Sequence, residues 1–213
     1  PSNKPSVPAV PPAPPAARPD NVASSPPGVI ASQPRPATDS AATDARLITD
    51  WRECTGTDPK RAMVGCQALL KAAKPSDDDF ARISLNLGKA LRETNSADQA
   101  ISAYSDSIRV KPSADTYNQR GIAYYDKGEW NKAIEDYSEA IRLDPNLGDA
   151  YNNRAWTLYR AGRASEAIDD ADKAVRMLES QSYAWDTRGH IHEKLGNKAA
   201  AIRDFRRAVA LDK

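Results

Sequence analysis

Apolar and polar residues follow the spacing of amphipathic helices through the C-terminal half of the chain. After Tyr117, a glycine and a tyrosine come at steps of four and three, and similar steps join the alanines and aromatic residues after Gly128. Such steps place side chains on one face of a helix. Glycine readily ends a helix in the left-handed conformation, and a proline such as Pro145 cannot continue one. The pattern therefore predicts pairs of helices joined at a glycine.

This pattern recurs every 34 residues, in units whose first helices carry Tyr117, Tyr151 and Trp185. Small residues recur at the same interval, at Ala133, Ala167, Ala201 and at Ala140, Ala174, Ala208. Large side chains at Tyr137 and Phe205 are expected to fill the wider gaps, whereas Ala171 stands at that position in the middle unit and predicts a thinner core there. Repetition at this period predicts a solenoid, in which each unit buries its apolar face against its neighbours.

The repeat resembles the tetratricopeptide repeat family in its aromatic, small and proline positions. The matching residues in the first full unit are Tyr117, Gly121, Ala133, Ala140 and Pro145. The resemblance is strong over about 114–213, and a weaker copy with Gly88, Ala100, Tyr104 and Pro112 precedes it at an offset of 33. It implies an all-α fold, a right-handed α-solenoid of antiparallel helix hairpins, and a non-enzymatic function in protein–protein interaction.

The chain is expected to divide into six segments. Residues 1–42 hold 12 of the 16 prolines and predict a disordered Pro/Ala-rich linker, either a plain spacer or a ligand for a proline-recognition domain. The helical segments are a degenerate hairpin at 43–78, a weak repeat at 79–113 and three regular repeats at 114–147, 148–181 and 182–213.

Each regular unit has an arginine on its first helix and an aspartate on its second, 16 residues later. The predicted pairs are Arg120 with Asp136, Arg154 with Asp170 and Arg188 with Asp204. The weak copy has Leu87 and Ala103 at these positions, so both charges are absent together. Because the guanidinium fork can hold a carboxylate with two hydrogen bonds, we expect partly buried structural ion pairs, with a charged ligand clamp as the alternative.

Cys54 and Cys66 are the chain's two cysteines and flank a predicted turn between two helices. Residues at this separation can meet across a helical hairpin, so a disulfide is expected to staple the most degenerate unit. A disulfide indicates an oxidising compartment, which favours a periplasmic or otherwise extracytoplasmic protein. The alternatives are two reduced core residues in a cytoplasmic protein or, less in keeping with two lone thiols, a metal or redox site.

The resemblance implies that a peptide binds in a concave groove lined by the first helices. The predicted groove residues are Asn118, Gln119, Tyr125, Asn152, Asn153, Trp156, Tyr159, Arg160, Asp186 and His190. Amide side chains can hold a peptide backbone, and aromatic side chains offer contact area at low entropic cost. Packing of Trp156 and Tyr159 against a neighbouring helix is the alternative. Some family members clamp a terminal carboxylate with lysines, but Ile122 and Tyr183 stand at the corresponding places here.

Composition narrows the function classes further. The net charge of +1 gives no broad field for nucleic acid or an anionic membrane, and no apolar run reaches the length of a membrane span. His190 and His192 point apart on a helix and are not expected to share a metal, so His192 is predicted to lie in the core and His190 at the groove. No catalytic set or phosphate loop is present in the sequence, and neither a cofactor nor an enzymatic activity is expected.

Three functions fit these observations. The first is a scaffold that binds a peptide or protein segment in its groove. The second is a structural subunit of an envelope complex, held by its convex face or N-terminal arm. In addition, the last helix is expected to leave an apolar side exposed, which indicates truncation, a partner or self-association through the C-terminal helix. The third is a cytosolic co-chaperone.

Overall fold

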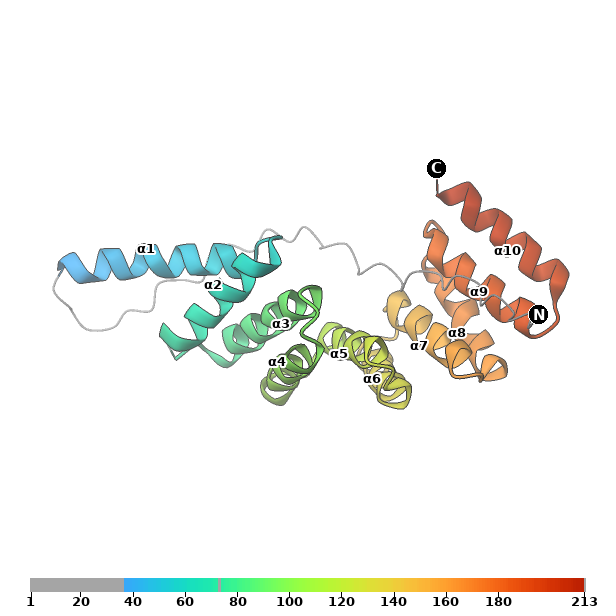
Figure 1. Ribbon diagram of the computed structural model, residues 1–213, viewed down its shortest axis with the longest axis horizontal. Helices are drawn as coiled ribbons and strands as arrows, with labels where there is room; N and C mark the ends of the chain where they lie inside the picture. The colour runs from blue at the N-terminus through green and yellow to red at the C-terminus, as the bar shows by residue number, and fades with distance from the viewer. Residues whose placement is uncertain (1–36, 73, 213) are drawn as a thin grey trace, which may run out of the picture.

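A computed structural model describes residues 37–72 and 74–212, with side chains from residue 43 onward. The helices of these ranges form five consecutive antiparallel hairpins (Figure 1). Their bounds are α1 Ala37–Cys54, α2 Pro59–Ala72, α3 Asp77–Glu93, α4 Ala97–Val110, α5 Ala114–Asp126, α6 Trp130–Leu143, α7 Gly148–Arg160, α8 Ala164–Met177, α9 Ser182–Lys194 and α10 Lys198–Leu211. The predicted α-solenoid is confirmed, and the described residues contain no strand.

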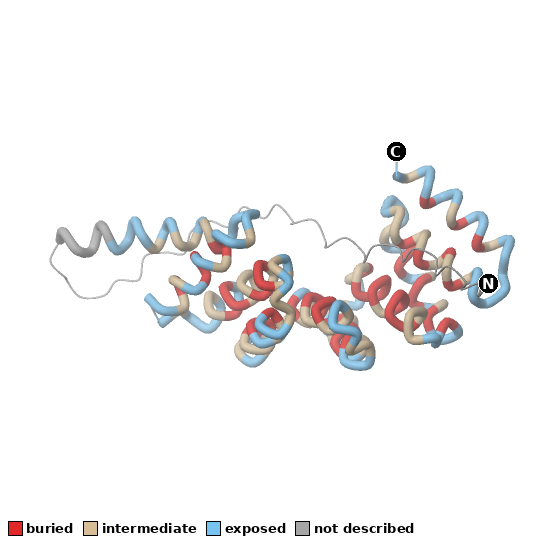
Figure 2. Tube along the Cα trace, in the orientation of Figure 1, coloured by how far each residue is buried: buried red, intermediate tan, exposed pale blue. Residues whose placement is uncertain are grey.

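The hairpins stack in chain order into a bowed array, with α1 at one end and α10 at the other (Figure 1). Each helix packs chiefly on the helices before and after it, and the first helices α3, α5, α7 and α9 also contact one another in succession. Buried residues line the facing sides of the helices along the whole array (Figure 2). The core is therefore continuous and one hairpin thick, as stacked repeats require.

The turn inside each regular hairpin depends on a glycine. Gly128, Gly162 and Gly196 have φ angles of 76°, 79° and 81°, in the left-handed region that a side chain makes costly. The weak repeat uses Asn95 instead, with φ at 58°. Asparagine tolerates this region better than most residues, because its short polar side chain can bond locally. The first helix of each regular hairpin therefore ends at the glycine, as the sequence pattern predicts.

A glycine of a different kind lets the two helices of a hairpin approach closely. A Cβ atom at Gly121 would lie 2.6 Å from the Tyr137 ring, and one at Gly189 would lie 2.6 Å from the Phe205 ring. In the middle hairpin both positions are alanine, at 155 and 171, and they join a cluster with Leu158, Ala167 and Ile191. The two helices of a hairpin thus pack closely in two ways: an aromatic ring faces a glycine in the first and third regular repeats, and two alanines take these positions in the middle one.

The start of α1 differs from the predicted boundary between linker and helical array. The linker was expected to extend to residue 42, whereas α1 begins at Ala37. Residues 37–42 are mostly alanine, threonine and serine and contain no proline, so nothing in them prevents the helix from beginning here. The remainder of the predicted linker, residues 1–36, lies outside the described residues.

Candidate functional site

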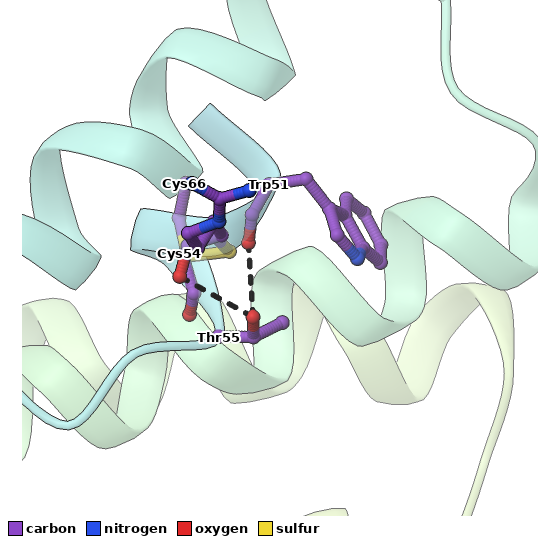
Figure 3. The surroundings of a disulfide bond; sticks show 5 residues. Trp51, Cys54, Thr55 and Cys66 are labelled. Atoms are coloured by element: carbon purple, nitrogen blue, oxygen red, sulfur yellow. Dashed lines mark hydrogen bonds between the residues drawn. A yellow bond between two sulfur atoms is a disulfide. The ribbon is translucent and has the colours of Figure 1, made fainter. Parts of the chain in front are cut away.

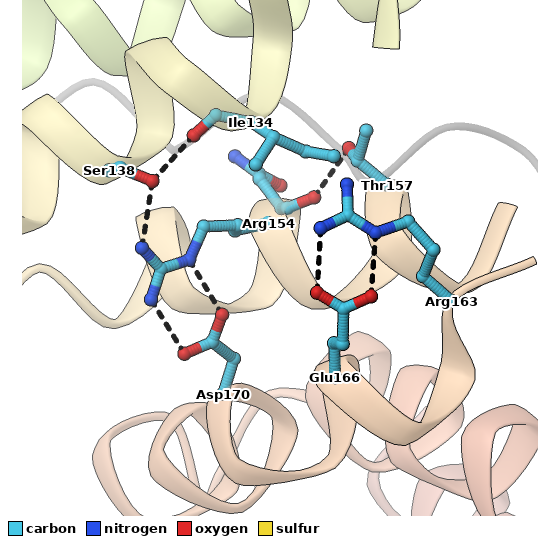
Figure 4. A network of polar contacts seen from close by, with 8 residues as sticks. Ile134, Ser138, Arg154, Thr157, Arg163, Glu166 and Asp170 are labelled. Carbon is cyan, nitrogen blue, oxygen red and sulfur yellow. Dashed lines mark hydrogen bonds and ion pairs between the residues drawn. The ribbon is translucent and has the colours of Figure 1, made fainter. Parts of the chain in front are cut away.

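The arginine and aspartate of each regular hairpin form a two-pronged ion pair. Arg154 donates from Nε to one carboxylate oxygen of Asp170 at 2.7 Å and from Nη2 to the other at 2.8 Å. Its third nitrogen, Nη1, donates to the Ser138 hydroxyl on α6 at 2.9 Å (Figure 4). One guanidinium therefore joins the two helices of its own hairpin and ties them to the hairpin before.

The same arrangement is present in the other two regular repeats. Arg120 holds Asp136 with two bonds of 2.8 Å, and its Nη1 donates to Ser105 on α4. Arg188 holds Asp204 at 2.7 and 2.9 Å, and its Nη1 donates to Asp172 on α8. The predicted pairs are thus present, and the residues that accept the third bond were missed. The signal for them was a short polar residue at 105, 138 and 172, one repeat apart.

The burial of these ion pairs favours the structural interpretation over a ligand clamp. Asp136, Asp170 and Asp204 are buried. The hydrogen bond to Asp136 is the main cause that raises the pKa of Arg120, and the hydrogen bond to Asp204 acts in the same way on the pKa of Arg188. Each of the three guanidinium nitrogens already donates a hydrogen bond within the protein, so the orientation of the group is fixed by the scaffold.

The weak repeat fills the same place with apolar side chains. Leu87 packs against a cluster that contains Ala103, Tyr104 and Ala123. Replacing both members of an ion pair with apolar residues avoids the cost of desolvating a single unpaired charge. The joint loss of the two charges in this repeat is therefore consistent with a purely structural role for the pair.

The first hairpin secures its crossing with a disulfide between Cys54 and Cys66, whose Cα atoms lie 4.6 Å apart (Figure 3). The two cysteines are 12 residues apart, as are Gly121 and Ala133 in the first regular repeat. They occupy the corresponding pair of small-residue positions on the two helices. Both are buried in a cluster with Leu69 and Ile83. The disulfide therefore joins the two helices covalently where the regular repeats carry two small residues.

Several predicted groove residues are buried by neighbouring helices, which corrects their assignment as direct ligand contacts. Exposure is 4% for Trp156 and 0% for Asn152. Asn118, Gln119 and Asn153 are also buried, and Asn153 donates to the Asn118 side chain at 3.1 Å. Successive first helices pack side by side and cover these positions. The bond between Asn153 and Asn118 joins two repeats, whereas Gln119 donates to Asp115 within α5, and none of these buried side chains lines an open groove.

Trp156 lies at the centre of a cluster that spans three first helices. Its Nε1 donates to the Tyr125 hydroxyl on α5 at 2.8 Å, and Arg160 donates to the same hydroxyl at 3.1 Å. The Trp156 ring lies 5.3 Å from the Tyr159 ring and 5.8 Å from the His190 ring on α9, measured between centroids. The buried indole therefore fixes the position of four surrounding side chains.

Five predicted groove residues remain partly exposed and define what we call the first-helix surface. They are Tyr125, Tyr159, Arg160, Asp186 and His190. The Asp186 carboxylate lies 3.6 Å from His190 Nε2, and partial burial raises the pKa of Asp186 despite this neighbour. The surface thus combines aromatic rings with one permanent cation and one partly desolvated carboxylate. Such groups can bind a polypeptide by packing and by directed polar contacts.

The two histidines lie in different surroundings. His190 packs against the aromatic rings of Trp156 and Phe205, the latter at 5.0 Å between centroids. His192 is only partly buried, not fully in the core as predicted, and its Nε2 lies 3.9 Å from Asp204. In the part of the chain that the structure describes, no three histidine, cysteine or acidic side chains gather in a group able to hold a metal. None of its helices combines the length and hydrophobicity needed to cross a membrane.

Stacked helix hairpins with these contacts define a repeat scaffold, and comparison with known proteins identifies its family. Models described as TPR repeat or tetratricopeptide repeat match residues 81–113, 121–162, 147–180 and 182–213. The chain belongs to the tetratricopeptide repeat family, and it is accordingly a protein-interaction scaffold. The α1–α2 hairpin precedes the first matched residue, although it continues the array in space.

Solved structures of MamA share the fold. One is 23% identical, with a TM-score of 0.66 over 76% of this chain and 94% of the other. A second is 22% identical, with a TM-score of 0.67 over 81% of this chain and 93% of the other. A double mutant of MamA from RS-1 reaches a TM-score of 0.68 at 13% identity, over 80% of this chain and 94% of that one. No curated protein matches the sequence.

Proposed function

We propose that this protein is a non-enzymatic scaffold that binds a partner protein segment on its first-helix surface. The observation that carries the proposal is the fixed aromatic cluster around Trp156. A buried indole holds Tyr125, Tyr159 and His190 from three separate helices, so these side chains lose little freedom when a ligand covers them. Rigid aromatic residues beside an arginine are typical of the residues that dominate binding energy at interfaces.

The partner segment would lie across α5, α7 and α9. Tyr159 and His190 offer ring faces for an apolar side chain, while Arg160 retains nitrogen donors beyond its bond to Tyr125. Asp186 and Arg160 lie on neighbouring first helices and carry opposite charges, so a bound segment would be held in one of its two possible orientations. A bound segment that places an acidic group near Arg160 and a donor near Asp186 would match it.

The test replaces the exposed side chains and leaves the buried indole in place. Changing Trp156 itself would remove a core residue and confuse binding with folding. A photoreactive amino acid at position 159 should capture a defined protein from the native source, and Arg160→Ala in the same chain should reduce the yield. The matched control carries the photoreactive residue at Leu143, which is also exposed but lies on α6. Equal capture from position 143, or no effect of Arg160→Ala, would remove this surface from the proposal.

We further propose that the protein works in an oxidising compartment outside the cytoplasm. The disulfide of α1–α2 supports this placement, because such bonds persist where thiols are not kept reduced. Alkylation of free thiols in intact cells, before lysis, should leave both cysteines unlabelled. Full labelling in that experiment would favour the cytoplasm.

A further inference from the structure

The outer face of α10 has the composition of a surface that normally packs on another helix. Ile202 is 51% exposed and Val209 is 67% exposed. One repeat earlier the corresponding residues are Ile168, which packs against a core cluster, and Val175, which is buried. In the preceding hairpins this side of the second helix lies against the next first helix. Much of α10 is drawn as exposed in Figure 2, and its exposed Ile202 and Val209 stand where the preceding repeat has a stacking face.

A charge on the same face limits which helix can cover it. Ser138 and Asp172 accept a hydrogen bond from the arginine of the following repeat. The corresponding residue in α10 is Arg206, which is exposed. A further repeat with an arginine at the usual place would bring two guanidinium groups together, which is unfavourable. The exposed face of α10 instead suits a first helix that carries a carboxylate at the arginine position.

The first helix of this same chain carries such a carboxylate. Because Cys54 corresponds to Gly121 at the close helix crossing, Glu53 corresponds to Arg120. Its side chain is 24% exposed, and its ion-pair partner is Arg61, a residue of α2 that is 70% exposed. Glu53 is therefore open to a second cation. The acceptor position on α10 and the arginine position on α1 thus carry opposite charges, Arg206 and Glu53.

The surroundings of Glu53 on α1 are also exposed. Thr49 and Arg52 stand at repeat positions that face the preceding hairpin in later first helices, where Thr116 meets Ser107 on α4 and Asn153 donates to Asn118 on α5. Their counterparts in α5 are Thr116 and Gln119, which are both buried. Both ends of the array therefore present stacking faces, and α1 and α10 lie at opposite ends (Figure 1).

We infer that α10 of one copy packs on α1 of a second copy, in the register of the internal repeats, with Arg206 against Glu53 of the partner molecule. Ile202 and Val209 then cover the exposed face of α1. The two surfaces are different, so the contact is head to tail and leaves a free α1 face and a free α10 face at the ends of every assembly. The assembly should therefore grow with protein concentration. The contact leaves the first-helix surface free, so it stands apart from the proposed function.

Charge reversal in two separate chains tests the register. Sedimentation of the unmodified chain over the micromolar range should show mass that rises with concentration. Arg206→Glu and Glu53→Arg should each weaken the association about tenfold or more, since each places like charges together. Mixing the two variants should restore growth in alternating order, because Arg206 of the Glu53→Arg chain meets the unchanged Glu53 of the other and Glu at 206 meets Arg at 53. A single chain that carries both changes should also associate, and only the swapped pair can account for that recovery. Circular dichroism of each variant establishes that the helices remain folded.

Two further variants separate this contact from other interfaces. Arg203→Glu makes the same charge change on α10, but its counterparts Glu135 and Asp169 remain exposed within the stacked array, so association should change little. Thr49→Arg adds bulk at the centre of the α1 face and should reduce association as strongly as Arg206→Glu. A monomer at every concentration would overturn the inference. Loss of association with Arg206→Glu, together with unchanged association of Glu53→Arg, would overturn it in favour of contact between two α10 helices.

Discussion

The α1–α2 hairpin and the three regular repeats hold the same helix crossing together by different chemistry. In α1–α2 a covalent bond joins Cys54 on the first helix to Cys66 on the second. In α5–α10 small residues occupy those positions, and an arginine one residue earlier holds the second helix through its aspartate. The disulfide acts only within its own hairpin, whereas each arginine also reaches the hairpin before it. The regular repeats are therefore coupled to one another in a way that α1–α2 does not share.

Removing the disulfide should produce the largest loss, and the loss should stay within the first hairpin. Cys54→Ala with Cys66→Ala removes the bond and keeps small residues at the crossing. We expect the hairpin to lose about 3 kcal/mol of stability, because the unfolded chain is no longer constrained over this short loop. Calorimetry should show a separate transition at lower temperature. Reductant should shift the unmodified protein and leave the double variant unchanged.

Breaking one ion pair should cost somewhat less and should spread further. Asp170→Ala leaves Arg154 without its carboxylate, and we expect a loss of about 2–3 kcal/mol, moderated because the arginine side chain is 22% exposed. Changing both residues to those of the weak repeat, Arg154→Leu with Asp170→Ala, should recover most of this loss. The control is Asp169→Ala at the exposed neighbouring position. A double variant that is less stable than Asp170→Ala would show that the apolar pair of the weak repeat cannot replace the ion pair in this hairpin.

Filling the close crossing should have an intermediate effect that depends on the ring opposite. Gly121→Ala places a methyl group against Tyr137, and we expect a loss of about 1–3 kcal/mol in the free energy of unfolding. Combining it with Tyr137→Ala recreates the alanine pair of the middle hairpin. Chemical denaturation should show that the double variant loses less than the two single variants added together. Simple additivity would mean that the glycine does not serve to admit the ring.

The smallest effects should come from the turns. Gly162→Ala puts a side chain into the left-handed region and should cost about 1 kcal/mol. Asn95→Gly relieves the milder strain in the weak repeat and should give a smaller gain. Comparing the midpoints of urea denaturation measures both. Loss of stability with Asn95→Gly would show that the asparagine side chain contributes more than its backbone conformation costs.

The sequence predicts those parts of the structure that follow its 34-residue period. The hairpins, the turns at Gly128 and Gly162, and the pairing of Arg154 with Asp170 all recur at fixed positions, so each copy supports the others. The cysteine pair was predictable from its separation across a turn. The site was less predictable, because the burial of Trp156 and Asn152 depends on how tightly one first helix lies against the next.

The contacts that hold the aromatic cluster illustrate this limit. Tyr125 accepts bonds from Trp156 and from Arg160, yet these positions are 31 and 35 residues away and belong to no repeated pair. A single copy of such a contact has no signature in a periodic pattern. The partly exposed residues of the first-helix surface could be named from the sequence, whereas their attachment to a buried indole could not.

Hydrogen exchange of the intact chain with and without reductant tests most directly whether the two regions are stabilised separately. Because the disulfide acts only within α1–α2, reduction should speed the exchange of backbone amides in α1 and α2 and leave those in α5 to α10 protected as before. Protection lost together along the whole array, or unchanged in α1 and α2 after both cysteines are shown to be reduced, would contradict it.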